Sequence, residues 1–298
     1  MANDTMLTQM RDKPGFIAAL DQSGGSTPGA LRQYGIPDSA YNGDDEMFRL
    51  IHAMRVRIIT APAFTGEKVI GAILFEATMD GMAQGKPVPA FLWEDRGVVP
   101  FLKVDKGLEA EVDGVRFMKP IPALDALLSR AAKAGIFGTK MRSVIERASP
   151  SGIAGVVAQQ FELAAQIGSH GLVPILEPEV SIKIADKAEA ESLLRTELLK
   201  GLDALPSTRN VMIKLTIPDT PDFYLPLIDH PRVVRVVALS GGYTRSDACR
   251  RLAANHQMIA SFSRALINDL TKSMSEPEFD AALVQSIDEI WKASVDKV

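Results

Sequence analysis

Short apolar runs alternate with helical segments along nearly the whole chain, and this alternation limits the folds open to it. An apolar run bounded by Gly, Pro or polar residues is typical of a strand buried on both faces of a parallel sheet. Such runs cover 16–20, 69–75, 99–104, 136–140, 173–176, 212–215, 233–239 and 258–262. Eight strands alternating with helices predict either a (β/α)8 TIM barrel or a doubly wound sheet. The strand count, and the lack of a Gly-x-Gly-x-x-Gly turn after the first strand, favour the barrel.

Helix boundaries are marked at several points between these strands. Asp186 and Glu189 have the spacing of a capping box at the start of a helix. Ser275 and Glu278 repeat that spacing before the last helix. Gly135 should end the helix that precedes the fourth strand, because glycine readily adopts the left-handed conformation found after helices.

The composition is that of one globular domain. Hydrophobic residues make up 46% of the 298 residues, which is enough for a substantial core. No linker, low-complexity stretch or clear repeat divides the chain, so residues 1–298 are expected to form a single barrel domain. The segment 26–45 is rich in Gly, Pro and polar residues, and there we expect a loop with one short helix.

Charge and cysteine content exclude several classes of protein. With 33 basic and 37 acidic residues, the chain lacks the positive field that nucleic acids or anionic membranes attract, so we expect neither as a partner. Cys249 is the only cysteine, which rules out an intrachain disulfide and fits a reducing compartment. We see no signal peptide and no apolar run near the ~20 residues that cross a bilayer. A cytoplasmic protein is therefore expected.

Lys214 lies in the middle of an apolar run, Val-Met-Ile-Lys-Leu-Thr. Burying an ammonium group without compensation is costly, so the amine should either lose its charge or find partners. A neutral, desolvated lysine amine is a nucleophile for carbonyl carbon. Lys214 is therefore the first candidate for covalent chemistry.

Polar residues are dense where the predicted strands end, which is where barrel enzymes place their chemistry. A structural ion pair explains any single strand-end charge more simply, but recurrence at six strands favours a site. Because side chains alternate along a strand, Lys103 shares a face with Asp105, and Lys140 shares one with Arg142. The other strand-end residues are Asp21, Ser23, Ser26, Glu177, Glu179, Ser240, Gly241, Gly242, Ser263 and Arg264.

Lys103, Lys140 and Lys214 should point into one confined mouth. Mutual repulsion and desolvation would both lower their pKa values, by up to ~3–5 units for a fully buried amine. Glu177 follows an apolar run, so its pKa should rise unless a lysine pairs with it, and it could shuttle protons in either case. Asp21 could act as a second base at another substrate atom.

Anion-binding residues follow the last two strands. Ser240, Gly241 and Gly242 let backbone N–H groups approach a ligand, and Arg264 begins the next helix. A phosphate held by the loops after strands seven and eight is common in barrels. The segment from Ser23 to Ser26 could hold a second phosphate, although a structural turn is an equally good explanation.

The four histidines show no metal-ligand spacing. Glu177 and Glu179 could bind a hard cation, but the intervening proline and the nearby lysines favour proton transfer. We expect neither a metal nor another cofactor.

The order of these motifs resembles class I (Schiff-base) fructose-bisphosphate aldolase, in a compact bacterial-type form. The resemblance spans roughly residues 19–266, with Lys-Val-Asp-Lys-Gly from Lys103 and Glu-Pro-Glu from Glu177 its most specific motifs. Animal members differ in carrying Glu at the position of Gln22, Trp at that of Met141, and a flexible tail ending in Tyr, whereas the last tyrosine here is Tyr243.

The resemblance implies reversible cleavage of fructose 1,6-bisphosphate into dihydroxyacetone phosphate and glyceraldehyde 3-phosphate. Lys214 would form the Schiff base, with Glu177 as its general acid and base and Lys140 as electrostatic support. Asp21 would deprotonate the C4 hydroxyl. Supporting roles would fall to Glu179 and Lys103 in orientation, to Ser240, Gly241 and Arg264 at one phosphate, and to Ser23 and Ser26 at the other.

Three alternatives stay open. The chain could be another Schiff-base barrel aldolase acting on a different sugar phosphate, or a metal-dependent barrel enzyme that chelators would inactivate. It could also be a non-catalytic phosphate-binding scaffold, although unpaired charges kept together in a barrel mouth argue against that. The expected partner is a phosphorylated sugar, and a homo-oligomer is possible.

Overall fold

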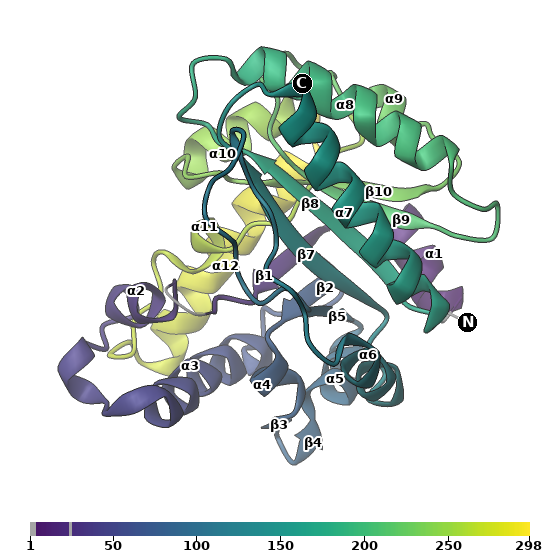
Figure 1. Cartoon of the computed structure of the whole chain (residues 1–298). Coiled ribbons are helices and arrows are strands. Elements are labelled where there is room, and N and C mark those ends of the chain that lie inside the picture. Colours follow the sequence, from purple (N-terminus) through teal and green to yellow (C-terminus); the bar gives the residue numbers. More distant parts are fainter. Residues whose placement is uncertain (1–3, 24–25) are drawn as a thin grey trace.

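The computed structural model describes residues 4–23 and 26–298, and in that part of the chain eight parallel strands form a barrel (Figure 1). Consecutive neighbours in the barrel are β1 (Phe16–Leu20), β2 (Val69–Leu74), β5 (Val99–Lys103), β7 (Gly138–Ile145), β8 (Val173–Val180), β9 (Val211–Thr216), β10 (Val233–Leu239) and β11 (Ile259–Ala260). The backbone N–H of Ala19 donates to Phe262 O at 3.0 Å and joins the two edges. Each predicted strand is present, and the TIM barrel is confirmed.

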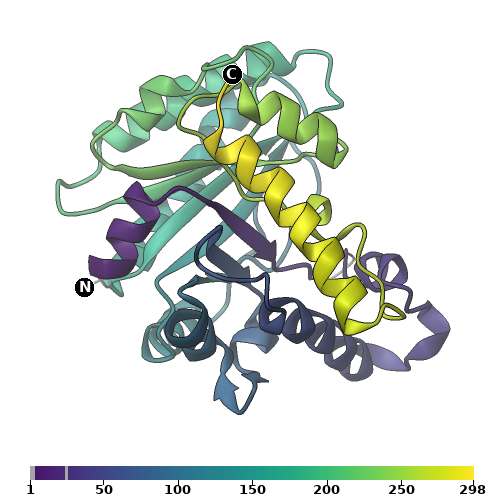
Figure 2. The ribbon, with the colours of Figure 1, turned by 180° about the vertical axis from the view of Figure 1, so that it is seen from behind.

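Helices cover the outside of the barrel. Figure 2 shows the C-terminal helix α12, in yellow, crossing the back of the molecule, and α1 beside the start of β1. The helices are α1 (Asp4–Asp12), α2 (Ser26–Gln33), α3 (Gly43–Thr60), α4 (Glu76–Met79), α5 (Val88–Ala90), α6 (Leu124–Lys133), α7 (Pro150–Ser169), α8 (Lys187–Asp203), α9 (Leu225–Ile228), α10 (Arg245–Ala253), α11 (Arg264–Ile267) and α12 (Glu276–Val295). Short pieces complete the fold: η1 (Asp38–Ala40), η2 (Phe91–Asp95), a β3–β4 hairpin (Met82–Ala83 and Lys86–Pro87), and β6 (Val115–Arg116), antiparallel to β7.

Two local predictions are corrected by the structure. The segment 26–45 contains α2, η1 and the start of α3, because apolar side chains such as Leu31 and Tyr34 are buried there against the core. Asp186 precedes α8 but does not cap it, since its carboxylate accepts a hydrogen bond from Ala148 N at 2.7 Å instead. The capping box before α12 is confirmed.

The expected stop at Gly135 is also confirmed. α6 ends at Lys133, Ala134 is its C-cap residue, and Gly135 follows with a φ of +84°. That left-handed conformation costs glycine little.

The barrel interior is apolar at the amino ends of the strands and charged at their carboxyl ends. Ala19, Phe101, Ile175 and Met212 belong to an interior cluster that also contains Met10 of α1. Because side chains alternate along a strand, the residue two positions further on faces the same interior. Those next positions are occupied by Asp21, Lys103, Glu177 and Lys214, so the pattern of strand residues itself places a layer of charges above the core.

Within the described ranges, none of the helices combines the length and apolar character needed to span a membrane.

Candidate active site

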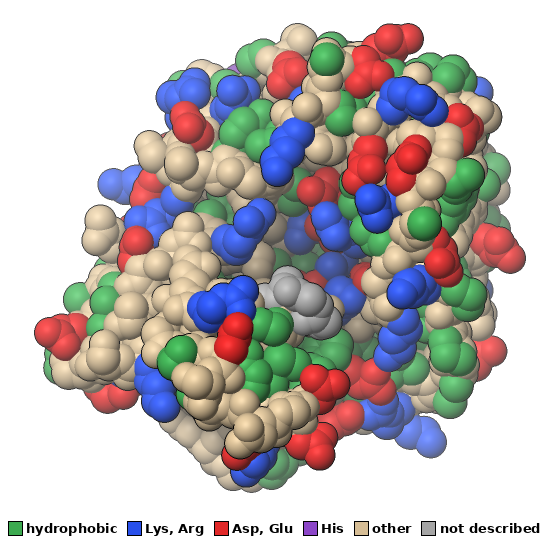
Figure 3. All heavy atoms as spheres, turned by 60° about the vertical axis from the view of Figure 1, so that its left-hand side comes forward, with side chains coloured by type: hydrophobic (Ala, Val, Ile, Leu, Met, Phe, Trp, Pro, Cys, Tyr) green, Lys and Arg blue, Asp and Glu red, His purple; other side chains and the backbone are tan. Residues whose placement is uncertain are grey.

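A pocket of about 750 Å³ opens at the carboxyl ends of the barrel strands. Figure 3 shows this face of the molecule, where basic and acidic side chains gather around a hollow. Most of the lining comes from strand ends and the loops that follow them, as the sequence predicts. The predicted residues that line it are Asp21, Ser23, Lys103, Lys140, Arg142, Glu177, Glu179, Lys214, Ser240, Gly241, Ser263 and Arg264.

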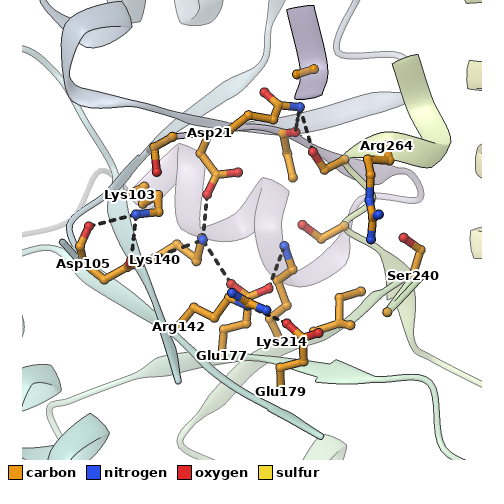
Figure 4. Close-up of a pocket in the computed structure, with 18 of the residues that line it drawn as sticks. Asp21, Lys103, Asp105, Lys140, Arg142, Glu177, Glu179, Lys214, Ser240 and Arg264 are labelled. Carbon is orange, nitrogen blue, oxygen red and sulfur yellow. Dashed lines mark hydrogen bonds and ion pairs between the residues drawn. The ribbon is translucent and has the colours of Figure 1, made fainter. Parts of the chain in front are cut away.

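A chain of alternating charges crosses the floor of the pocket (Figure 4). Lys140 Nζ lies 2.6 Å from Asp21 Oδ2 and 3.1 Å from Glu177 Oε2. The other oxygen of Glu177 lies 3.1 Å from Lys214 Nζ. Asp105 Oδ2 is 4.0 Å from Lys140 Nζ. All five side chains are buried, so every charge is compensated by a direct neighbour rather than by bulk water.

Two further ion pairs lie at the edges of this chain. Lys103 Nζ donates to Asp105 Oδ1 at 2.6 Å and to the carbonyl of the same residue at 2.8 Å. Arg142 pairs with Glu179. The predicted shared face of Lys103 and Asp105 is confirmed by the first pair. These contacts hold the outer charges in fixed positions around Lys140 and Glu177.

The lysines keep the acidic groups ionised. Burial acts to raise the pKa of Asp21, but the charges of Lys140 and Lys214 outweigh burial and hold that pKa at about 2. For Glu177 burial likewise acts to raise the pKa, and the same two lysines bring it below its usual value. Glu177 therefore pairs with lysines, which is the condition under which the sequence predicts that its pKa is not raised.

The expectation of a lowered pKa is wrong for Lys140. Burial does act in that direction, but the carboxylates of Asp21, Glu177 and Asp105 overcome it and raise the pKa of Lys140 above the usual lysine value. The sequence indicates only that three lysines converge. The structure adds that three carboxylates lie within 4.0 Å of the Lys140 amine. Lys140 therefore keeps its positive charge more strongly than an ordinary lysine, which favours electrostatic support over nucleophilic attack.

The loops after β10 and β11 form the other side of the pocket. Gly241 and Gly242 have φ values of +60° and +110°, and a Cβ at Gly241 would lie 2.9 Å from Ile182 Cγ2. A glycine turn is therefore required there by both the backbone and the packing. Arg264 is exposed and has no ion pair or hydrogen bond within the described residues, so its guanidinium is available to an anion.

Two predicted residues stand apart from the others. Gly242 is outside the pocket lining, next to Ile182 and near Arg264, and so supports the turn rather than the pocket wall. The side chain of Ser26 lies outside the described part of the structure.

Three further lining residues, Ser261, Gln22 and Gln33, were not among the site residues predicted from the sequence. Ser261 lies two positions before Ser263 on the same strand end, so alternation could have found it. Gln22 follows Asp21, and its amide donates to Ser263 Oγ at 2.7 Å. Gln33 lines the pocket from α2, a helix that no sequence signal placed there.

No group of three or more His, Cys, Asp or Glu side chains is placed to hold a metal ion within residues 4–23 and 26–298.

Comparison with known proteins identifies the family. The family model for fructose-bisphosphate aldolase class-I matches residues 15–212. The chain belongs to the class I fructose-bisphosphate aldolase family. The family predicted from the motifs is therefore confirmed.

Relatives extend the match over nearly the whole chain. A fructose-bisphosphate aldolase class 1 from Synechocystis sp. is 55% identical over 293 residues, covering 98% of this chain and 98% of its own. One from Porphyromonas gingivalis is 54% identical over 293 residues, covering 98% and 99%. The fructose-bisphosphate aldolase of Plasmodium falciparum, solved with TRAP and an inhibitor, shares the fold, with a TM-score of 0.74 and 20% identity over 98% of this chain and 94% of its own.

Proposed function

We propose that this family member reversibly cleaves fructose 1,6-bisphosphate into dihydroxyacetone phosphate and glyceraldehyde 3-phosphate through an imine on Lys214. One observation carries the proposal: a buried lysine amine lies 3.1 Å from a buried carboxylate at the floor of the pocket. A positioned carboxylate beside an amine is the arrangement that imine formation needs, because protons must move at each step. The reaction needs no metal, since a protonated imine is itself the electron sink.

Glu177 is the acid and base for imine formation. Its lowered pKa keeps it ionised, so it can accept a proton from the ammonium of Lys214 and release the free amine. The amine nitrogen then adds to the C2 carbonyl carbon of the sugar, and one N–H proton passes to the former carbonyl oxygen, which becomes a hydroxyl. Glu177 returns its proton to the resulting hydroxyl, which leaves as water while the C2–N double bond forms. Lys140, 3.1 Å away, stabilises the carboxylate each time it is regenerated.

Asp21 is the base for carbon–carbon cleavage. It accepts the proton of the C4 hydroxyl, the C4–O bond becomes a carbonyl, and the C3–C4 bond breaks. The electron pair of that bond moves into the protonated imine, which becomes an enamine as glyceraldehyde 3-phosphate leaves. The pKa of about 2 ensures that Asp21 is ionised before the substrate arrives, and its 2.6 Å contact with Lys140 fixes its orientation.

Phosphate binding places the sugar between these groups. Arg264, together with the Ser240–Gly241 turn and Ser263, forms the proposed site for one phosphate. Ser23, which lines the pocket, and Ser26 are the residues proposed to bind the other phosphate. Holding both ends of the sugar reduces the entropic part of the barrier, because C2 is kept within reach of Lys214.

Steady-state kinetics test the proposal. Wild type should cleave fructose 1,6-bisphosphate in the presence of chelator, and faster than fructose 1-phosphate at equal concentration. Lys214→Met should abolish cleavage, and Glu177→Gln should reduce kcat by ~10²–10⁴-fold, the usual contribution of a general acid and base. Turnover that disappears with chelator, or that survives in Lys214→Met, would refute the proposed mechanism.

A further inference from the structure

Arg55 is a fully buried cation that the proposed chemistry does not use. It lies in α3 and is 1% exposed. Over the ranges that the structure describes, it makes no ion pair with a carboxylate, and its Nε has no hydrogen-bond partner. Burying a guanidinium without an adjacent counterion is costly, so a chain that keeps one gains something specific from it.

The contacts of Arg55 show what it holds. Its Nη2 donates to the backbone carbonyl of Gln22, and its Nη1 donates to Thr78 Oγ1 at 2.9 Å. The guanidinium carbon also lies 5.8 Å from the centre of the Phe75 ring. Arg55 therefore ties α3 to the segment after β1 on one side and to the segment after β2 on the other.

The held carbonyl is immediately next to Asp21 in the chain. β1 ends at Leu20, which pairs with Leu74 of β2, so Asp21 and Gln22 lie beyond the last paired residue of the strand. The position of the Asp21 carboxylate then depends on what fixes the main chain after Leu20. A rigid, planar guanidinium that donates a hydrogen bond to Gln22 O is suited to that purpose.

We infer that Arg55 is a positioning residue that fixes the Asp21–Gln22 main chain, so that Asp21 can reach the C4 hydroxyl of the substrate. The inference rests on the proposed function, because it assigns Asp21 to carbon–carbon cleavage. The inference predicts different effects on imine formation and on carbon–carbon cleavage. Imine formation uses Lys214 and Glu177 on neighbouring strands, whereas cleavage alone depends on the segment that Arg55 holds.

Electrostatics support the same assignment. The charge of Asp21 stabilises protonated Arg55 through space, although burial outweighs it and lowers the pKa of the guanidinium to about 10. The other cations that act on Asp21 are Lys140, Lys214 and Lys103. Arg55 thus carries its charge at neutral pH, and its interaction with the charge of Asp21 is attractive.

The half-reactions can be measured separately. Dihydroxyacetone phosphate has no C4 hydroxyl. Exchange of a hydrogen on its hydroxymethyl carbon with solvent therefore requires the imine but not the proposed action of Asp21. In Arg55→Met, we expect kcat for cleavage of fructose 1,6-bisphosphate to fall by ~10–100-fold, the effect of displacing a catalytic group by about 1 Å. Exchange and borohydride trapping with dihydroxyacetone phosphate should stay within about twofold of wild type.

Arg57 provides a matched control on the same helix. Its guanidinium donates to Met274 O at 2.6 Å and lies 4.1 Å from the centre of the Phe279 ring, so it holds α12 rather than the pocket. Arg57→Met removes an arginine that also donates to main-chain carbonyls but that, unlike Arg55, is partly exposed and pairs with Glu276 at 3.0 Å. It should lower the urea midpoint while leaving kcat unchanged. Arg55→Lys keeps the charge with a single donor group, and we expect it to recover part of the cleavage rate.

Two results would overturn the inference: unchanged cleavage in folded Arg55→Met, or cleavage and exchange falling in parallel. If Arg55→Met fails to fold, Arg55→Lys is subjected to the same comparison and must show cleavage reduced more than exchange. A wild type without cleavage or exchange would instead refute the proposed function, so the two failures are distinguishable.

Discussion

Replacing Lys140 by Met removes the central cation of the pocket floor and leaves its shape nearly unchanged. Three carboxylates, from Asp21, Glu177 and Asp105, lie within 4.0 Å of the lysine amine and would lose it together. Removing one partner of a buried ion pair costs ~3–5 kcal/mol, because the remaining charge is left uncompensated. Lys140→Met should therefore be less stable at neutral pH by an amount in that range.

The pH dependence of this loss follows from Asp21. In wild type its folded pKa of about 2 lies below the unfolded value of 3.8, so it contributes about 2 kcal/mol of stability above pH 4, which is lost as the pH falls from about 4 to about 2. Without Lys140, burial is less opposed and the folded pKa of Asp21 rises. The folded variant then binds the proton more readily, so its stability improves relative to wild type as the pH falls.

Urea unfolding at about pH 7 and about pH 5 measures both effects. The gap between the midpoints of wild type and Lys140→Met should narrow at the lower pH. The double variant Asp21→Asn/Lys140→Met removes one of the carboxylates left without the Lys140 counterion, and it should be more stable than Lys140→Met at neutral pH. An equal gap at both pH values, or a double variant less stable than the single one, would contradict the reasoning.

The other predictions concern the phosphate side of the pocket. Arg264→Ala should raise KM for fructose 1,6-bisphosphate by ~10–100-fold, because a charged hydrogen bond contributes ~1.5–3 kcal/mol, and kcat should change less. Arg250→Ala, on the exposed surface of α10, is its control, and an unchanged KM in Arg264→Ala would remove Arg264 from the site. Gly241→Ala should also raise KM, since it strains a φ of +60° and brings Cβ to 2.9 Å from Ile182. Gly35→Ala has a φ of +86° with nothing within 4 Å of its Cβ, so equal KM values for both alanine variants would show that the contact with Ile182 is unimportant.

The strands and most of the site were predictable because they depend on local pattern. Apolar runs locate the strands, and strand alternation places the charged residues above the apolar interior. Which charges pair was not predictable, because it depends on the register between strands. Lys103 is the register partner of Lys140, and Arg142 is that of Glu177, and only this alignment brings three carboxylates around one lysine.

Features that depend on tertiary packing were missed or wrong. One short helix was predicted in the segment 26–45, but η1 and the start of α3 were not, because the burial of Leu31 and Tyr34 that orders this segment depends on tertiary packing. Asp186 and Glu189 have the spacing of a capping box, but the Asp186 carboxylate accepts a hydrogen bond from Ala148 N in a neighbouring loop. Arg55 lies within an ordinary helical segment, and nothing in its neighbours distinguishes a buried arginine from an exposed one.

The central claim is that Lys214 forms a covalent imine with the sugar. The most direct measurement is intact-mass and peptide mass spectrometry after borohydride reduction with fructose 1,6-bisphosphate and chelator present. The account predicts one adduct per chain, located on Lys214 and absent from Lys214→Met. An adduct on Lys140 or Lys103, or active enzyme that gives no adduct at all, would contradict it.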